Sequence, residues 1–436
     1  MFVLEKNMNK VAAIATAGGR EVSSAVDWID YRTARPLCFP RANTAALPER
    51  SMVELAQEER EAFLDLILSL RTSPYLLEEQ ESFIASVKEI AVRALSKATL
   101  DRILTELHSG LGAVVVCGLP EDPDLPDTPA RGGSLPPNYK KTFVSEAVLL
   151  ALGSITGAEP FNFRQEGRGT APLIDNVVSV RELKAVKGSG GYENNFPFHC
   201  ESTWHRRRPD YLVLVGIRED PTAKTLAFST EMLESVIEPL TPAEAEGRFR
   251  LRGPELYDQM ERIGIPLGTA KYAFMNPVEN LTTGLKLNLN FNGSDCADAA
   301  AVEWLSKLET YIEEHAMAAV LGPGKALILN NDRTCHTRNG YTPSFDGRGR
   351  WLIRGYFKKD LWALNPAPLD NGSEVCSEQD FNDLLELGWM TESRQLTPEF
   401  FKYIRQPNLI LSLGEKESRL AAIAVHFTPV AGTRLV

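Results

Sequence analysis

Short runs of strand-forming residues, separated by polar or Gly/Pro breaks, constrain the fold of this chain more than any other feature. The clearest runs are YLVLVGI (211–217), TLAFS (225–229), LKLNLNF (285–291), KALILNN (325–331) and WLIRGYF (351–357). Runs of this length and composition are typical of β-strands. No GxGxxG or GxxxxGK[ST] motif favours a doubly wound sheet. We therefore expect a mainly β fold, with a sandwich or barrel core decorated by helical inserts near 230–262 and 298–320.

The run LKLNLNF alternates strictly between apolar and polar residues. Its apolar members are Leu285, Leu287, Leu289 and Phe291, and its polar members are Lys286, Asn288 and Asn290. Because successive side chains of a strand point to opposite faces, one face should pack in the core and the other should be available to a ligand. Asn288 and Asn290 are therefore candidate substrate contacts.

Helical patterns precede the strand runs. Ser51 and Glu54 have the spacing of a capping box, which predicts that an amphipathic helix starts there, and more helix is expected up to about His108. A β-type run (112–120) and another helical stretch (139–155) follow. These helices are expected to form a scaffold for the strands.

The change from helical to strand-like sequence patterns along the chain predicts three parts. They are an N-terminal helical extension (1–95), a β-rich domain (96–365) and a C-terminal extension (366–436) that contains a helix-like segment at 377–389. The two extensions could form a homodimer interface or cover the core. Nothing in their residues favours one role over the other.

Charge and composition bear on partners and location. The formal net charge is −11 and the basic residues do not form a long tract, so we expect a small-molecule substrate and neither nucleic acid nor a membrane surface as partner. The chain lacks a membrane-spanning run and a convincing secretory signal, so a cytoplasmic location is expected. Six dispersed cysteines with no CxxC pair favour reduced, buried thiols.

Only six histidines are present, which makes the search for metal ligands short. His199 and Glu201 form a His-x-Glu pair whose side chains would share one face of a strand, although about one such pair is expected by chance among 58 acidic residues. His336 follows a strand run and supplies a third ligand. Two histidines and one carboxylate form the facial triad that suits iron(II). A zinc hydrolase could use the same residue types, but the HExxH motif of metallopeptidases is absent.

Two arginines could hold the distal carboxylate of a 2-oxo acid cosubstrate, because the planar guanidinium matches a carboxylate. Arg350 and Arg354 lie 14 and 18 residues after His336, and their spacing of four residues puts them on the same side of a strand. The alternative is that one or both are surface arginines of the charged turn DGRGRW.

Three segments carry a resemblance to a known family: FPFHCESTWHRRRPDYLVLVGIRED, TAKTLAFS and LILNNDRTCHTRNGYTPSFDGRGRWLIRGYF. Over roughly residues 96–365 the chain resembles the clavaminate synthase-like branch of the TauD/TfdA iron(II)/2-oxoglutarate dioxygenases. The resemblance implies a double-stranded β-helix core of the jelly-roll, cupin-like kind, with N-terminal helices and helical inserts. The cofactors that it implies are Fe(II), 2-oxoglutarate as cosubstrate and O2.

The same resemblance implies roles for individual residues. It implies that His199, Glu201 and His336 bind iron and are catalytic, that Arg350 and Thr225 bind 2-oxoglutarate, and that Ser189 and Arg354 contact the substrate, as in amino-acid hydroxylases of this branch. Thr225 taken alone could simply be a strand former, and Ser189 lies in a Gly- and Asn-rich stretch that is either a lid or a plain loop.

One departure from the family pattern bears on the substrate. Arginine-hydroxylating relatives carry acidic residues on the strand that here reads LKLNLNF, whereas this chain has Asn288, Asn290 and Asn292. Amides donate and accept hydrogen bonds, so a neutral polar substrate end fits better than a cation, although Asp295 and Asp298 lie close enough to leave the point open.

The expected function is hydroxylation of an unactivated C–H bond in an amino acid or an amino-acid-derived natural-product metabolite, with succinate and CO2 as coproducts. Desaturation, epoxidation or ring closure with the same cofactors is the nearest alternative. A metal-free β-barrel binding protein and a zinc-dependent hydrolase are alternatives of a different class.

Overall fold

The computed structural model describes residues 27–35, 44–162, 172–187, 190–203, 208–233, 242–252, 272–359, 378–392, 397, 399–400 and 420. Its described strands form four separate sheets, accompanied by helices. The architecture is therefore mixed helix and sheet, and no closed barrel is present in these ranges.

The largest sheet has seven strands, and three of the predicted strand runs form its centre. Its order is β2 (Met52–Glu54), β3 (Ala113–Cys117), β14 (Lys325–Asn330), β6 (Tyr211–Arg218), β16 (Trp351–Lys358) and β4 (Glu159–Phe161), with β5 (Asp175–Val178) also paired to β16. Only β2 and β3 pair in parallel. The strands predicted at 211–217, 325–331 and 351–357 are confirmed to within a residue.

A smaller sheet carries part of the candidate site. It contains β13 (Met317–Ala319), β7 (Thr225–Ser229) and β15 (Thr334–Arg338). His199 extends this sheet, because it forms a β-bridge with His336 on one side and with Asn290 on the other. The strand predicted at 225–229 is confirmed.

The remaining described elements are short or peripheral. The third sheet is β1 (Ile29–Asp30), β12 (Ser294–Cys296), β8 (Phe249–Arg252) and β9 (Tyr272–Phe274), and the fourth is the hairpin of β10 (Val278–Leu281) and β11 (Gly284–Leu287). The short helices are α1 (Tyr31–Ala34), η1 (Glu49–Ser51), η2 (Arg181–Leu183), η3 (Thr230–Met232) and α7 (Pro242–Ala245), and α10 is Glu378–Glu386.

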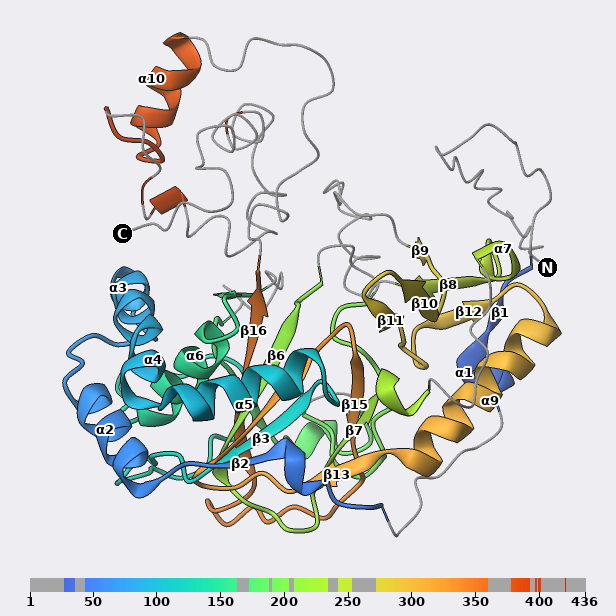
Figure 1. The fold of residues 1–436 in the computed structure, drawn as a ribbon, viewed down its shortest axis with the longest axis horizontal. Coiled ribbons are helices and arrows are strands. Elements are labelled where there is room, and N and C mark those ends of the chain that lie inside the picture. The colour runs from blue at the N-terminus through green and yellow to red at the C-terminus, as the bar shows by residue number, and fades with distance from the viewer. Residues whose placement is uncertain are drawn as a thin grey trace, which may run out of the picture.

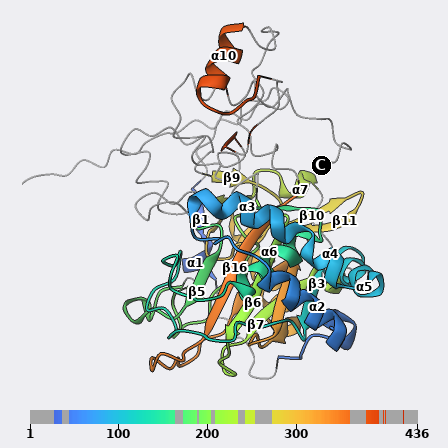
Figure 2. The same cartoon turned by 90° about the vertical axis from the view of Figure 1, so that its left-hand side faces the viewer.

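Both faces of the large sheet are buried. On β6, Val213 and Val215 belong to a core shared with helices, whereas Leu212 and Leu214 belong to the core shared with the smaller sheet. This alternation follows from the two-residue period of a strand. The helices are α2 (Gln57–Leu68), α3 (Leu77–Lys88), α4 (Ile90–Ala94), α5 (Lys97–His108) and α6 (Val144–Ser154). They cover one side of the sheet (Figure 1), and Figure 2 shows them in front of β3, β6 and β16.

The smaller sheet is covered on its other face by α9 (Ala299–His315). Leu226 and Phe228 of β7 share a core with Leu305 and Leu308 of this helix. Asp298 caps α9, because its carboxylate accepts a hydrogen bond from the N–H of Ala301. The predicted helical insert at 298–320 is thus confirmed, and Figure 1 shows α9 on the opposite side of the molecule from α2–α4.

Three predicted elements differ from the structure. Residues 52–54 pair with β3 instead of starting a helix, and α2 begins at Gln57, where Glu59 accepts a hydrogen bond from the N–H of Ala56. The described part of 230–262 is short helices and strand β8 rather than a helical insert. In LKLNLNF the apolar residues do pack in one core, but the regular strand ends at Leu287. Beyond it the chain turns, since the N–H of Gly293 donates to the carbonyl of Asn290.

Two composition-based expectations can be compared with these ranges. No described helix is long and apolar enough to span a bilayer. Cys117, Cys200, Cys296 and Cys335 are free and buried, which confirms the prediction of thiols for these four. Cys38 and Cys376 lie outside the described residues.

Candidate active site

His199, Glu201 and His336 come together between the seven-stranded sheet and the three-stranded sheet of β13, β7 and β15, as the sequence predicts. One ligand atom from each lies within 4.8 Å of those of the other two, and all three side chains are largely buried. Glu201 Oε1 is 3.4 Å from His336 Nε2 and 3.8 Å from His199 Nε2. The site therefore presents two imidazole nitrogens and one carboxylate oxygen toward one point.

Backbone pairing places the two histidines opposite each other. The N–H of His199 donates to the carbonyl of His336 at 3.1 Å, and the N–H of His336 donates back at 2.9 Å. A directly paired residue shares the face of its partner, and Glu201, in the turn that follows His199, brings its carboxylate to the same point. His199 Nδ1 lies 3.0 Å from the carbonyl of Pro197, which can only accept, so Nδ1 carries the hydrogen and Nε2 is free for a metal.

Glu201 is held as a carboxylate. The phenol of Tyr356 donates to Oε2 at 2.9 Å, and Arg354 Nη1 donates to Oε1 at 3.3 Å. Burial alone would raise the pKa of Glu201, but chiefly the charge of Arg354 holds that pKa well below its usual range. Burial lowers the pKa of His336, which favours the neutral imidazole that a metal requires.

The backbone of Glu201 is clamped by Asn331, which follows β14. Asn331 Oδ1 accepts from the N–H of Glu201 at 2.7 Å, and Nδ2 donates to its carbonyl at 3.0 Å. The next residue, Ser202, has φ of 51°, the left-handed region that L-residues rarely occupy. This strained turn directly follows the acidic member of the cluster, where tertiary contacts enforce it.

The three side chains fit a metal ion. Ligand atoms about 2.1 Å from one ion and at right angles to each other lie about 3 Å apart, close to the separations found here. Two imidazoles and one carboxylate on a single face leave other coordination positions open, which suits iron(II) better than a closed structural zinc site.

Arg350 fits the distal carboxylate of a 2-oxo acid. Its side chain is only 5% exposed, and within the described part of the chain no carboxylate forms an ion pair with it. Its guanidinium lies 5.9 Å from the ring centre of Tyr341. Burial lowers the pKa of Arg350, partly offset by the electrostatic effect of Tyr341 and by the charge of Asp220, which forms no ion pair with it. A buried cation without an anion is expensive, so an anionic ligand is the natural partner.

Thr225 lies on the same sheet face as His336, because β7 and β15 pair with His336 opposite Ala227 and Arg338 opposite Thr225. It is 4% exposed. Thr225 thus lies beside Arg338 on the face that carries His336, and its role toward the cosubstrate stays a prediction.

Arg354 also belongs to the site. Its Nη2 donates to Asp175 Oδ2 at 2.6 Å, while Nη1 reaches Glu201. Burial lowers the pKa of Arg354 and the charges of Tyr356, Asp175 and Glu201 raise it, with a net rise. The guanidinium is thus permanently charged beside the candidate metal ligands. The surface-turn alternative for Arg350 and Arg354 is wrong, since both are buried or half-buried.

The other predicted substrate contacts are less direct. Asn288 Nδ2 donates to the carbonyl of Asn276, and Asn290 Oδ1 accepts from the backbone of Asn292 and Gly293, so both amides already have local partners. Asn290 nonetheless lies beside His199 through their β-bridge. Ser189 lies outside the described residues.

Asp295 and Asp298 are occupied elsewhere. Asp295 pairs with Arg250 and Arg252, and Asp298 pairs with Arg248 and caps α9. Neither offers a free carboxylate to a cationic substrate.

Sequence reasoning missed several residues that shape the site: Tyr356, Asn331, Asp175, Arg338 and Tyr341. Two of them left a signal, because Tyr356 and Arg338 are each two residues beyond a predicted site residue and therefore share its strand face. Asn331 and Asp175 reach the site only through tertiary pairing.

The other described histidines have structural surroundings. His108 lies 2.9 Å from the hydroxyl of Tyr211, and the ring of His315 stacks on Tyr311 at 4.0 Å. His205 and His426 lie outside the described residues.

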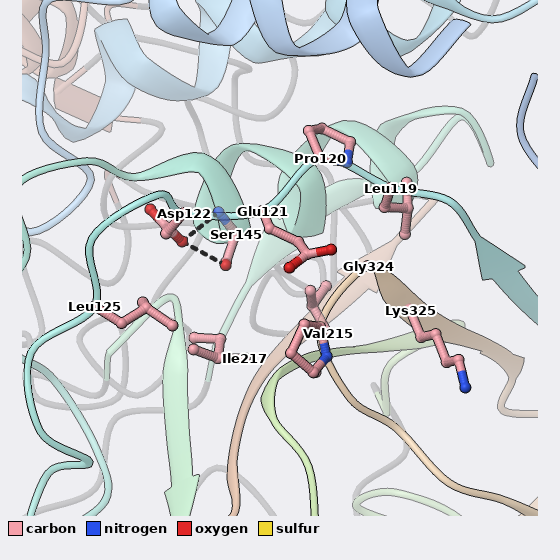
Figure 3. A pocket seen from close by; sticks show the side chains of 12 residues that line it. Leu119, Pro120, Glu121, Asp122, Leu125, Ser145, Val215, Ile217, Gly324 and Lys325 are labelled. Carbon is pink, nitrogen blue, oxygen red and sulfur yellow. Dashed lines mark hydrogen bonds between the residues drawn. The ribbon is translucent and has the colours of Figure 1, made fainter. Parts of the chain in front are cut away.

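A small pocket lies apart from this cluster (Figure 3). Its wall includes Val215 and Ile217, whose side chains point to the helix-covered face of the large sheet and so away from the histidines. Asp122 at its edge accepts hydrogen bonds from the N–H and the hydroxyl of Ser145, and it forms an ion pair with Lys140. The pocket contains none of the predicted site residues.

Comparisons with known proteins support the site chemistry, although no protein-family model matches the sequence. The chain is 27% identical to L-asparagine oxygenase from Streptomyces coelicolor over 337 residues, which cover 75% of this chain and 96% of that protein. It is 27% identical to clavaminate synthase 2 from Streptomyces clavuligerus, covering 57% and 74% respectively. A crystal structure of asparagine oxygenase with Fe(II), 2S,3S-3-hydroxyasparagine and succinate matches with a TM-score of 0.60 at 27% identity, covering 73% of this chain and 97% of that one.

The resemblance seen in the sequence is thus confirmed across most of the length of these relatives. The chain is similar in sequence and in fold to iron(II)/2-oxoglutarate-dependent oxygenases of the TauD/TfdA-like family, which includes the clavaminate synthase-like branch.

Proposed function

We propose that this oxygenase hydroxylates an unactivated C–H bond of an amino acid or an amino-acid-derived natural-product metabolite. The observation that carries the proposal is the cluster of His199, Glu201 and His336, buried together with ligand atoms within 4.8 Å. In this proposal these three residues bind iron(II), and Arg350 and Thr225 bind 2-oxoglutarate. When bound, iron(II), 2-oxoglutarate and O2 supply the oxidation: one oxygen atom enters the substrate C–H bond, the other enters succinate, and CO2 leaves.

The protein contributes position and charge. Tyr356 and Asn331 hold Glu201 from its side chain and its backbone, which fixes the carboxylate relative to the two imidazoles. Burial between two sheets keeps the reacting groups away from bulk water. Fixed geometry of this kind is the main share that a protein adds to a cofactor reaction.

The charges beside the cluster support an α-amino acid as substrate. An amino acid carries a carboxylate and an ammonium group, and Arg354 and Asp175 offer the complementary charges side by side. We propose that Arg354 binds the substrate carboxylate, with Ser189, Asn288 and Asn290 near the rest of the molecule.

A neutral polar side chain on the substrate is favoured over a cation. Asp295 and Asp298, the acids nearest to the Asn-bearing segment in sequence, already pair with arginines. L-asparagine oxygenase, one of the relatives, acts on an amino acid of this neutral type. Desaturation, epoxidation and ring closure use the same cofactors, whereas similarity to this family speaks against a metal-free binding protein or a zinc hydrolase.

We also infer that the large sheet and the smaller sheet are the two faces of a double-stranded β-helix core within residues 96–365. The cluster of Leu212, Leu214, Ala227 and Met317, which joins the inner faces of both sheets, supports this arrangement. Residues 1–95 and 366–436 are proposed as extensions of this domain. A homodimer and a cytoplasmic location stay predictions from the sequence.

A substrate screen tests the proposal. Purified protein with iron(II), 2-oxoglutarate and O2 is incubated with single amino acids, and succinate and any product heavier by one oxygen atom are measured by mass spectrometry. We expect neutral amino acids with polar side chains to give both products in equal amounts, and His336→Ala to give neither. Preference for arginine or lysine would contradict the proposed substrate class.

A further inference from the structure

A second buried arginine lies beside Arg350. Arg338, at the end of β15, is 8% exposed, and its guanidinium lies 5.3 Å from the ring centre of Tyr341. Arg350 lies over the same ring at 5.9 Å. Two guanidinium groups therefore share one aromatic neighbour in the interior of the protein.

The position of Arg338 follows from the strand that carries the candidate metal ligand. Arg338 is two residues after His336, so both side chains leave the same face of β15. Thr225 is its direct partner on β7. Arg338 thus lies among the groups proposed to bind the 2-oxo acid.

The hydrogen bonds of Arg338 do not neutralise its charge. Its Nη atoms donate to the backbone carbonyls of Tyr192, Asn194 and Asn339. Throughout the ranges that the structure describes, neither Arg338 nor Arg350 forms an ion pair with a carboxylate. Carbonyl oxygens satisfy N–H groups, and the charge of Asp220 acts on Arg350 without forming an ion pair, so the two neighbouring buried cations still lack a directly paired anion. An anion is therefore expected within reach of both.

We propose that Arg338 is a second cationic group for the distal carboxylate of 2-oxoglutarate and makes the site selective for dicarboxylic 2-oxo acids; this inference rests on the function proposed above. Arg350 and Arg338 together form a two-arginine site, with Tyr341 holding both guanidinium planes in place. Arginine is suited to this role because it stays charged when buried and stacks on aromatic rings.

A purely structural role predicts something different. If Arg338 only ties the 192–194 segment to β15, its loss would loosen the site for every 2-oxo acid. If its charge acts on the distal carboxylate, its loss would weaken the binding of 2-oxoglutarate. Binding of 2-oxobutanoate, which has the same chelating end and no distal carboxylate, would stay the same. The ratio of the two affinities separates these roles.

The experiment measures anaerobic binding of 2-oxoglutarate and of 2-oxobutanoate to the Co(II)-loaded full chain by calorimetry. The variants are Arg338→Gln, which removes the charge, and Arg338→Lys, which keeps the charge and loses the fork that reaches the three carbonyls. The matched control is Arg333→Gln, because Arg333 also donates to backbone carbonyls, those of His108 and Gly110, and has no role in the proposal.

We expect Arg338→Gln to lower the affinity for 2-oxoglutarate by about 10- to 100-fold, the range for a lost charged hydrogen-bonding group. The affinity for 2-oxobutanoate should change by less than about threefold. Arg338→Lys should keep most of the wild-type preference for 2-oxoglutarate over 2-oxobutanoate, and Arg333→Gln should keep all of it. If Arg338→Gln keeps the wild-type preference, or if Arg338→Lys loses as much of it as Arg338→Gln does, the inference is overturned. Failure of wild type to bind 2-oxoglutarate at all would instead overturn the proposed function.

Discussion

Tyr356 and Glu201 meet between the seven-stranded and the three-stranded sheet, where the phenol donates a 2.9 Å hydrogen bond to Oε2 of the carboxylate. The other oxygen, Oε1, faces both histidines. Tyr356 therefore occupies one carboxylate oxygen and leaves the other for a metal ion, which favours binding through a single oxygen.

Removal of the Tyr356 hydroxyl should weaken metal binding. Loss of a group that orients a metal ligand typically costs about 10- to 100-fold in affinity, and we expect this for Tyr356→Phe. The measurement is a Co(II) titration followed by the visible absorption of the bound ion. Tyr211→Phe is the matched control, since Tyr211 lies on the neighbouring strand, is also buried, and bonds to His108 instead. Equal Co(II) affinity in both variants would contradict the role of Tyr356 in orienting Glu201.

Asn331 should stabilise the protein and the metal site together. Asn331→Ala leaves the buried N–H of Glu201 without its partner, which costs about 1–3 kcal/mol of unfolding free energy. Urea unfolding of the metal-free protein measures this loss, and a Co(II) titration should show weaker binding as well. A fully stable variant with unchanged affinity would contradict the clamp.

The lowered pKa of Glu201 gives a pH dependence with a definite sign. Because the folded protein favours the carboxylate, chiefly through Arg354, the stabilisation is complete above the ordinary glutamate pKa of 4.5 and is lost as the pH falls through the lower folded value. Glu201→Gln should therefore destabilise the metal-free protein by about 1–3 kcal/mol at pH 7 and by much less near pH 3. A difference between the two proteins that does not vary with pH would exclude this role for ionised Glu201.

Arg350 and Arg354 should have separable effects. Arg350→Gln is expected to weaken 2-oxoglutarate binding by at least about tenfold while leaving metal affinity unchanged, because within the described residues no hydrogen bond or ion pair joins Arg350 to the three ligands. Arg354→Gln should instead reduce binding of the amino-acid substrate. Calorimetry with each ligand in turn distinguishes the two, and a reversed pattern would exchange their assigned roles.

Strand parity explains why most of the site could be predicted from the sequence. The two-residue spacing of His199 and Glu201 predicts that they act together, although Glu201 lies in the turn after His199, and scarcity of histidine left His336 as the natural third ligand. The buried strands β6, β14 and β16 were predictable because their apolar runs are short and bounded by breaks.

Features that depend on tertiary pairing could not be predicted. The stretch after Ser51 has the local spacing of a helix start, but pairing of Met52–Glu54 with β3 overrides it. The alternation in LKLNLNF predicts its buried face correctly, yet the turn at Asn290 ends the strand early. Asn331 has no local pattern at all, since its contacts with Glu201 span 130 residues.

The most direct test of the central claim is anaerobic addition of iron(II) and 2-oxoglutarate to the purified chain, with His199→Ala beside it. We predict that wild type develops the weak visible charge-transfer band of the iron–2-oxoglutarate chelate and that the variant does not. No band in folded wild type, or an equal band in His199→Ala, would contradict the assignment of His199, Glu201 and His336 as the iron site.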